Sequence, residues 1–115
     1  MDYERELLKG NTQTIVLAIL QDAPQHGYSI AREVERRSGN ALSFKDGTLY
    51  PALHALEHEG MVAGCWEAPH NGPARKVYTI TEAGLKELAR RRPIWNAFAR
   101  TIYNMIGGKL DAQPI

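Results

Sequence analysis

Cysteine is nearly absent from this sequence, and long apolar runs are missing. Cys65 is the single cysteine among 115 residues, so no intramolecular disulfide can form and a reducing compartment fits best. The longest apolar run, residues 15–20, is far shorter than the roughly 20 residues that cross a bilayer. The first six residues lack both a basic start and an apolar core, so no signal peptide is predicted. We therefore predict a cytoplasmic protein with no membrane partner.

The residue sets that enzymes need are also missing. No Ser/His/Asp set, carboxylate pair or phosphate-cradling loop occurs at usable spacing, so we predict neither enzymatic activity nor a cofactor. His54 and His58 have the spacing of two zinc ligands on a helix. However, Ala55 stands where a zinc protease needs glutamate, and the sequence offers no clear third ligand. We predict no metal site.

What is present is the composition of one ordinary folded domain. Hydrophobic residues make up 43% and charged residues 23% of the chain, which excludes a disordered tail or a collagen-like fibre. The net charge is only +1, but its distribution is uneven. Residues 1–67 carry six basic and ten acidic side chains, whereas residues 75–109 carry eight basic and two acidic ones. This asymmetry is compatible with a polyanionic partner, and solvated helix faces explain it equally well.

Apolar spacing predicts two helices before residue 40. Residues 11–22 form the first, and residues 2–9 are expected to add a short helical arm before it. Residues 28–38 form the second, which Gly39 ends. The stripes expected to face the core are Ile15, Val16, Ile19 and Leu20 in the first helix and Ile30, Ala31 and Val34 in the second.

The third helix, residues 46–60, is the most informative segment. Its core-facing stripe is Leu49, Leu53 and Leu56, at positions i, i+4 and i+7. Its opposite face holds Gly47, Pro51, His54 and His58. Because proline is tolerated in the first turn of a helix, this helix is expected to start late, with Asp46 or Thr48 as its N-cap.

A β-hairpin follows the three helices. Residues 61–67 and 75–80 are β-prone, and a turn-rich tip rich in proline and glycine separates them. Cys65 is expected to be half-buried on the first strand. Three helices followed by a hairpin with a basic base give the order of a winged helix-turn-helix. We therefore predict a mainly α (α+β) winged-helix DNA-binding domain over residues 1–80, with its wing at about 61–80.

A long helix, residues 81–108, completes the prediction, with Thr81 as its N-cap. Residues at near-heptad spacing form a stripe along this helix: Leu85, Leu88, Arg92, Trp95, Phe98, Ile102 and Met105. The three-helix core cannot cover this whole stripe, which indicates self-association. Pro93 removes the hydrogen bond to the Ala89 carbonyl, so a kink or break is expected there.

Five groups of residues resemble the PadR-like transcriptional regulators along nearly the whole chain. They are Leu8-Lys9-Gly10, His26-Gly27-Tyr28-Ser29-Ile30, Gly47-Thr48-Leu49-Tyr50-Pro51-Ala52-Leu53, Leu56-Glu57-His58-Glu59-Gly60-Met61-Val62, and Arg75-Lys76-Val77-Tyr78-Thr79-Ile80-Thr81-Glu82-Ala83-Gly84. The ordered set at these spacings is far more specific than any one group. The resemblance implies a homodimeric winged-helix repressor of the short subgroup, with a single C-terminal dimerisation helix.

Some members of that subgroup carry a tryptophan near the middle of this helix, where it lines an aromatic-ligand site at the dimer interface. Trp95 stands at the equivalent place, so the resemblance implies a small aromatic effector. The segment 90–93, Arg-Arg-Arg-Pro, departs from the smooth helix of the family. The residues predicted at the effector site and dimer interface are Leu88, Trp95, Phe98, Ile102 and Met105.

The third helix and the wing carry the predicted DNA contacts. A helix N-terminus attracts phosphate, hydroxyl groups of the first turns can add contacts, and His54 faces outward toward base edges. The predicted DNA-binding residues are Tyr28, Lys45, Thr48, Tyr50, Pro51, His54, Arg75 and Lys76. Core packing is an alternative role for Tyr28 and for Tyr50.

These inferences together predict a dimeric repressor that binds double-stranded DNA at a pseudo-palindromic operator and is released by a small effector. Two other functions stay open at this stage. One is a ligand-sensing or ligand-sequestering protein in which the aromatic seam is the main site. The other is a winged-helix adaptor that binds proteins.

Overall fold

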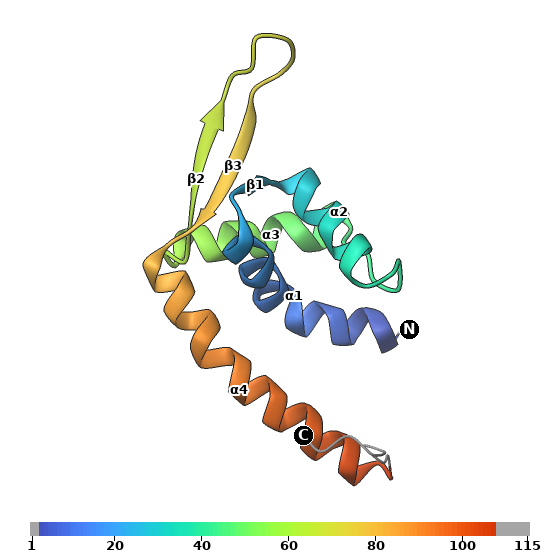
Figure 1. Cartoon of the computed structure of the whole chain (residues 1–115). Coiled ribbons are helices and arrows are strands. Elements are labelled where there is room, and N and C mark those ends of the chain that lie inside the picture. Colours follow the sequence, from blue (N-terminus) through green and yellow to red (C-terminus); the bar gives the residue numbers. More distant parts are fainter. Residues whose placement is uncertain (1–2, 108–115) are drawn as a thin grey trace.

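The computed structural model of the chain describes residues 3–107, which form an elongated body of 54 × 30 × 25 Å (Figure 1). The elements in chain order are α1 (Tyr3–Asp22), β1 (Gln25–His26), α2 (Gly27–Arg37), α3 (Asp46–His58), β2 (Val62–Glu67), β3 (Arg75–Ile80) and α4 (Glu82–Met105). The predicted fold class is confirmed: the chain is mostly helical, with a winged helix-turn-helix and a long C-terminal helix.

The core lies where α1, α2 and α3 meet the base of the sheet. The predicted stripe of α3 is confirmed, since Leu49, Leu53 and Leu56 are all fully buried. Helix α1 packs against α2, α3 and α4, so it is the centre of the body. The remaining apolar core residues are Val16, Leu17, Ile19, Leu20, Ile30, Val34, Phe44, Val62, Tyr78 and Leu88.

Two helices begin earlier than predicted. Helix α1 is one continuous helix from Tyr3, rather than a short arm followed by a separate helix. In α3 the N-cap is Lys45, whose carbonyl oxygen accepts hydrogen bonds from the backbone N–H groups of Thr48 and Leu49, both at 2.9 Å. Pro51 therefore lies in the second turn, and the predicted late start is wrong. The carbonyl that proline leaves without its usual donor belongs to Gly47, an exposed residue, so water can hydrate it.

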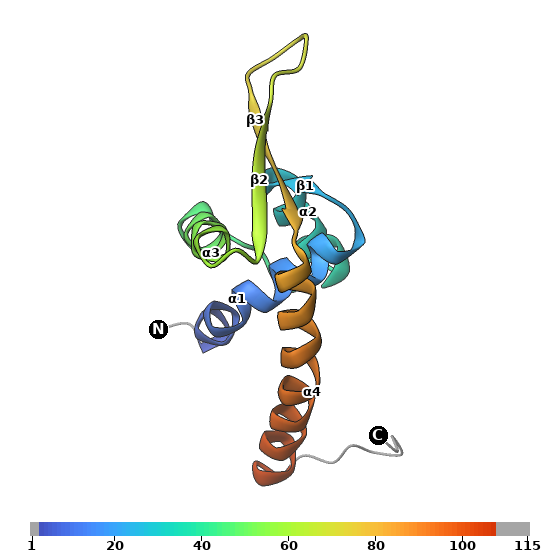
Figure 2. The ribbon, with the colours of Figure 1, turned by 90° about the vertical axis from the view of Figure 1, so that its left-hand side faces the viewer.

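The predicted hairpin is present, but the sheet has three strands in the order β1-β3-β2. Strands β2 and β3 pair from Val62 with Ile80 to Glu67 with Arg75. Strand β1 adds only two residues to the other edge of β3, and it is too short to leave an alternating pattern in the sequence. It ties the start of α2 to the base of the wing, which projects from the body in Figure 2.

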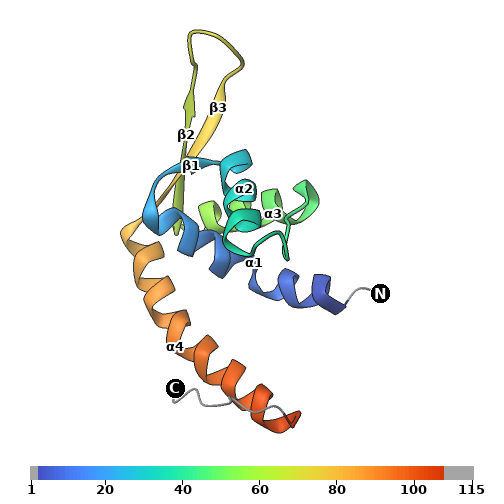
Figure 3. The same cartoon turned by 45° about the vertical axis from the view of Figure 1, so that its right-hand side comes forward.

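Helix α4 leaves the body on the side away from the wing (Figure 2). Thr81 caps it as predicted, because its hydroxyl oxygen accepts a hydrogen bond from the Gly84 N–H at 3.1 Å. The helix continues through Pro93, so the expected break there is wrong; Pro93 and Ala89 are both exposed, and water can reach the freed carbonyl. Figure 3 shows a curved helix, and a kink at Pro93 stays a prediction. Residue 108, the predicted end, lies outside the described residues.

Leu88 is a correction to the predicted dimer interface. Its side chain is only 2% exposed and belongs to the core of a single chain. A second copy cannot reach it. Leu88 anchors α4 to the body, and the apolar residues beyond it on α4 are exposed.

Candidate nucleic-acid interface

The face of α3 that turns away from the core meets the wing along a concave surface of about 380 Å³. We call it the wing groove. Five of the eight predicted DNA-binding residues line it: Tyr28, Tyr50, His54, Arg75 and Lys76. They come from α2, α3 and β3, so the fold brings together residues that lie up to 48 positions apart in the sequence. The other lining residues are His26, Gly27, Trp66, Ala74 and Tyr78.

The side chain of Tyr50 packs where α2 begins. A methyl group added at Gly27 would lie 2.6 Å from the Tyr50 hydroxyl oxygen, so a residue with a side chain cannot replace Gly27 unless the ring moves. Tyr50 is nevertheless 37% exposed and is not a member of the core, which excludes the core alternative. This packing holds the N-terminus of α2 against the face of α3 that forms the wing groove.

Tyr28 is 63% exposed, so it is not a core residue either. Its hydroxyl oxygen accepts a hydrogen bond from Arg32 Nη1 at 2.9 Å, and the Arg32 guanidinium lies 5.7 Å from the centre of the Tyr28 ring. Tyr28 and Arg32 therefore form one unit in the first turns of α2, with a cation at its edge.

Lys76 is less available than predicted. Its ammonium group donates to Glu57 Oε1 at 2.8 Å and lies 5.5 Å from the centre of the Tyr78 ring, so it links the wing to α3. The hydrogen bond between the Lys76 ammonium and the Glu57 carboxylate lowers the pKa of Glu57 and raises the pKa of Lys76. The side chain crosses β2 at Gly64, where a methyl group would collide with the Lys76 chain. Both partners are only partly exposed, which makes this pair stronger than a typical surface pair.

Arg75, in contrast, is exposed and keeps its donors. Its Nη1 lies 3.4 Å from His26 Nε2, while His26 Nδ1 accepts a long hydrogen bond from the Ser29 N–H and caps α2. A neutral imidazole that accepts through Nδ1 carries its proton on Nε2, so Nε2 cannot also accept from Arg75. The guanidinium is therefore positioned at the rim of the wing groove, where its N–H groups can donate to a ligand.

Lys45 and Thr48 lie at the other end of α3, away from the wing groove. They line a separate hollow of about 440 Å³, together with Gly47, residues 41–43 and the start of α1. Here the first N–H groups of α3 lack partners within the helix, and an anion would meet the positive end of the helix dipole beside Lys45. Pro51 is exposed on α3 between the two hollows.

Five residues that line the wing groove were not predicted, and His26 and Trp66 are the two with side chains best suited to contact a ligand. His26 could not be assigned because its role depends on strand β1, which is too short to recognise. Cys65, the neighbour of Trp66, was expected to be half-buried, whereas the structure leaves it exposed. Trp66 is 67% exposed, and this amount of exposed indole on a strand was the signal that alternation alone did not reveal.

A second candidate site lies between α1 and α4, at Trp95. The Trp95 indole N–H donates to Asn11 Oδ1 at 2.7 Å, and the ring borders an apolar groove of about 370 Å³. We call it the α1–α4 groove. It is lined by Glu4, Leu7, Leu8, Asn11, Thr14, Ile15, Ala18, Leu42 and Trp95. Four of the five predicted effector and dimer residues remain exposed on α4, namely Trp95, Phe98, Ile102 and Met105.

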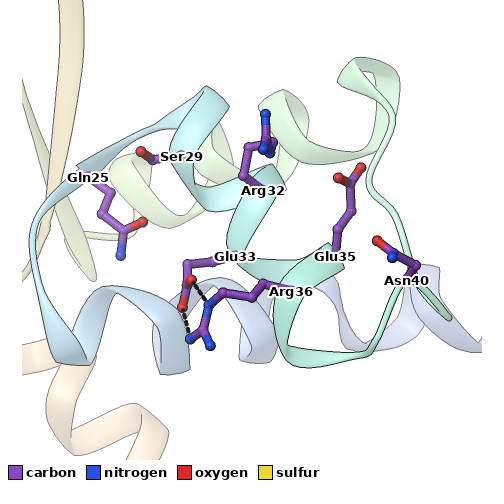
Figure 4. Close-up of a pocket in the computed structure, with 7 residues that line it drawn as sticks. All are labelled: Gln25, Ser29, Arg32, Glu33, Glu35, Arg36 and Asn40. Carbon is purple, nitrogen blue, oxygen red and sulfur yellow. Dashed lines mark hydrogen bonds and ion pairs between the residues drawn. The ribbon is translucent and has the colours of Figure 1, made fainter.

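A third hollow, of about 550 Å³, lies on the outer face of α2 (Figure 4). Glu33 and Arg36 pair within it, with Arg36 Nε 2.5 Å from Glu33 Oε1, and Arg36 and Arg37 together lower the pKa of Glu33 to about 2. Figure 4 shows Arg32 pointing away from this pair. Because Glu33 and Arg36 are already paired with each other and the lining side chains do not converge, the hollow offers no defined binding geometry.

Within residues 3–107, no helix is long and apolar enough to cross a membrane. In the same part of the chain, no group of three or more His, Cys, Asp or Glu side chains is placed to hold a metal ion.

Comparison with known proteins gives a consistent result. Residues 16–90 match the Transcriptional regulator PadR-like family. The transcriptional regulator Rv3488 of Mycobacterium tuberculosis is 30% identical over 105 residues, which cover 91% of this chain and 92% of that protein. Among solved structures, a PadR family transcriptional regulator from Eggerthella lenta superimposes with a TM-score of 0.78 at 25% identity, covering 90% of this chain and 88% of that one.

A further structure, Bacillus subtilis PadR in complex with operator DNA, superimposes with a TM-score of 0.62 at 27% identity. The match covers 68% of this chain and 44% of that one. The similarity to that DNA-bound protein is therefore confined to part of each chain.

Proposed function

The chain belongs to the PadR-like family of transcriptional regulators and is a DNA-binding regulator rather than an enzyme, and from this premise we propose that it is a homodimeric repressor. It acts in the cytoplasm, binds a pseudo-palindromic operator, and is released from it by a small aromatic effector. The observation that carries the proposal is the wing groove, where an exposed recognition face and a free arginine lie side by side.

The recognition face is the exposed side of α3. His54 offers ring nitrogens toward base edges, and Pro51 beside it presents a compact apolar surface to the major groove. Lys45 and Thr48 bind a phosphate at the N-terminus of the helix, and Arg75 binds a second one from the wing. These contacts fix the helix on one half-site. Two such helices in a dimer read half-sites about 34 Å apart, one turn of DNA.

Lys76 has a different role in this proposal. Because Glu57 already holds its ammonium group, Lys76 acts as a positioning residue that sets the angle between the wing and α3. Phosphate binding falls to Arg75, its exposed neighbour.

The exposed apolar face of α4 supports dimerisation. Trp95, Phe98, Ile102 and Met105 lie on one side of the helix, and residues 3–107 leave all four exposed. A second copy of α4 that packs along this face would bury them, as in a helix-pair interface.

The α1–α4 groove supports effector binding. It is apolar, it borders the Trp95 ring, and its volume suits a flat aromatic molecule. An effector bound there would change how α4 leaves the body and hence the distance between the two recognition helices. Quenching of tryptophan fluorescence by planar aromatic compounds tests effector binding in this groove. If no compound in a varied panel quenches the fluorescence, the proposed effector site is wrong.

Fluorescence anisotropy tests DNA binding. The labelled probes are a duplex from the DNA upstream of the gene that encodes this chain and a shuffled duplex of equal composition. Each is measured at two salt concentrations. We expect tighter binding to the upstream duplex and a steep loss of affinity as salt rises. Equal and salt-insensitive binding to both probes would contradict the proposal and favour a protein-binding adaptor.

Two substitutions localise the contacts. Arg75→Ala should weaken binding to both duplexes about ten-fold and lower the salt slope by about one, because it removes a phosphate contact. His54→Ala should instead reduce the preference for the upstream duplex, because it removes a base contact. His58→Ala, on the same helix face but outside the wing groove, is the matched control and should change neither quantity.

A further inference from the structure

Trp66 presents the largest exposed aromatic surface on the wing. Its side chain is 67% exposed and lines the wing groove with Tyr28, Tyr50 and His54. Its neighbour Cys65 is exposed as well. Single exposed apolar residues are common on protein surfaces, so exposure alone decides nothing. The position of the ring within the groove and the state of its N–H group are more informative.

The register of the hairpin fixes the face on which Trp66 lies. Trp66 is paired with Lys76, and residues directly opposite in a sheet project to the same side. The Lys76 side chain reaches Glu57 on α3, so this is the side of the wing that faces α3. Glu67, the next residue, projects to the other side by alternation. The Trp66 ring therefore stands at the open end of the groove, and the nearest wing carboxylate points away from it.

The two tryptophans of the chain differ in their hydrogen bonding. The Trp95 indole N–H is satisfied by Asn11 at 2.7 Å. Among residues 3–107, the Trp66 indole N–H has no acceptor. An indole N–H can only donate, and the phosphate oxygens of DNA are strong acceptors. A flat apolar body with one free donor at its edge matches the alternation of deoxyribose and phosphate along a DNA strand.

The local charge favours the same partner. On the side of the wing that faces α3, the Glu57 carboxylate is paired with Lys76. Arg75 is opposite Glu67 in the hairpin register, so these two side chains project to the other side of the wing. A polyanion that contacts Trp66 therefore meets a carboxylate that is already paired, and Arg75 lies across the strand at the rim of the groove.

We propose that Trp66 is a DNA-contact residue of the wing: its ring packs against the deoxyribose of one strand, and its N–H donates to an adjacent phosphate. This role rests on the proposed function, because it requires DNA to lie in the wing groove. Trp66 then supplies, on the side of the wing that faces α3, the contact that Lys76, held by Glu57, does not make.

The test combines two measurements on the same samples. The probe is a duplex of about 30 base pairs, three helical turns, from the chain's own upstream region. Anisotropy of a dye on the DNA reports binding, and tryptophan emission reports the indole environment. The wild-type protein contains Trp66 and Trp95, whereas Trp66→Phe contains only Trp95 and shows how much of the signal comes from that site.

We expect wild-type emission to be quenched and blue-shifted at the same DNA concentration at which anisotropy rises, and we expect Trp66→Phe to bind with little emission change. Trp66→Ala should bind about ten-fold more weakly, and Trp66→Phe about three-fold more weakly, since Phe keeps the ring but lacks the N–H. Cys65→Ala, which changes the other face of the same strand, is the control and should bind like the wild type.

The outcomes separate the two proposals. If anisotropy shows binding while wild-type emission and Trp66→Ala affinity are unchanged, the role of Trp66 is wrong and the proposed function stands. If anisotropy shows no binding to this duplex or to a duplex selected by the protein from random sequence, the proposed function fails, and the role of Trp66 fails with it.

Discussion

Two helices of the structure, α3 and α4, differ in where their apolar residues lie. In α3 the apolar stripe is fully buried within one chain, and the exposed face carries Pro51, His54 and His58. In α4 only Gly84 and Leu88 are buried, although Arg91, Arg92 and Trp95 still hydrogen-bond to α1. Beyond them, Phe98 is 63% and Met105 77% exposed. The apolar stripe of α3 is therefore buried within one copy of the chain, whereas the outer apolar residues of α4 are exposed in one copy.

The contrast between α3 and α4 distinguishes residues that fold one chain from residues available for association. The winged-helix body contains the whole hydrophobic core, so it can present its DNA-binding surface without a partner. The outer part of α4 gains its packing only when something covers it. The two regions join at the start of α4, beside the C-terminal end of α3.

That joint is built from backbone groups. The Thr81 hydroxyl donates to the Gly60 carbonyl at 2.6 Å, just after the end of α3, and the Thr81 N–H donates to the Met61 carbonyl at 3.0 Å. Gly84 packs directly on that same carbonyl. The start of α4 is thereby fixed to the C-terminal end of α3.

The largest expected effect comes from breaking this joint. In Gly84→Ala the new methyl group would overlap the Met61 carbonyl oxygen, and backbone cannot move aside as a flexible side chain can. We expect the free energy of unfolding to fall by about 3 kcal/mol in denaturant titrations at fixed protein concentration. Gly10→Ala is the control: nothing lies near that position in α1, so the helix should gain about 0.5–1 kcal/mol. Equal stabilities for the two variants would contradict the packing described at Gly84.

A smaller effect should come from the pair that links the wing to α3. If Lys76 and Glu57 position the wing, Lys76→Met and Glu57→Gln should each weaken operator binding by a similar factor, and the double variant should be no weaker than either single one. The salt slope should stay unchanged, because no phosphate contact is lost. A rise in affinity in Glu57→Gln, with a lower salt slope in Lys76→Met, would instead identify Lys76 as a phosphate ligand. Stability should fall by about 1 kcal/mol or less in each single variant.

The smallest effect concerns acid stability at the base of α4. Arg90 and Arg91 hydrogen-bond to Glu87 and lower the pKa of its carboxyl to about 2. A carboxyl whose pKa is lower in the folded than in the unfolded state stabilises the fold above its unfolded pKa, and this contribution is lost as pH falls toward 2. Glu87→Gln should therefore flatten the decline of unfolding free energy between neutral pH and pH 2. Glu82→Gln, a largely exposed residue in the same helix, should change that decline less.

Periodicity predicted most of the body but little of its detail. The leucine stripe of α3, the hairpin and the Thr81 cap are local patterns, and all three are present. The early start of α3 was not predicted because the cost of Pro51 depends on whether the Gly47 carbonyl can be hydrated, which is a property of the surroundings. The burial of Leu88 was missed because a heptad stripe does not indicate where the body stops covering a helix.

The candidate site shows the same limit. Five of the predicted DNA-binding residues lie together in the wing groove, since the order of the elements determines which faces meet, and their role in DNA binding stays a prediction. It could not distinguish Lys76 from Arg75, because that distinction depends on Glu57, 19 residues from Lys76 in the sequence. It also missed Trp66, whose face follows only from the hairpin register.

Sedimentation equilibrium of the wild type and of Phe98→Glu over a range of concentrations tests the central contrast most directly. Phe98 is exposed in one copy, so the substitution should leave the body folded, and the circular dichroism of the variant should confirm this. A charge in an apolar seam should prevent association. We expect twice the 12.9 kDa chain mass for the wild type and the single-chain mass for Phe98→Glu. A wild type that stays at 12.9 kDa at every concentration would contradict it.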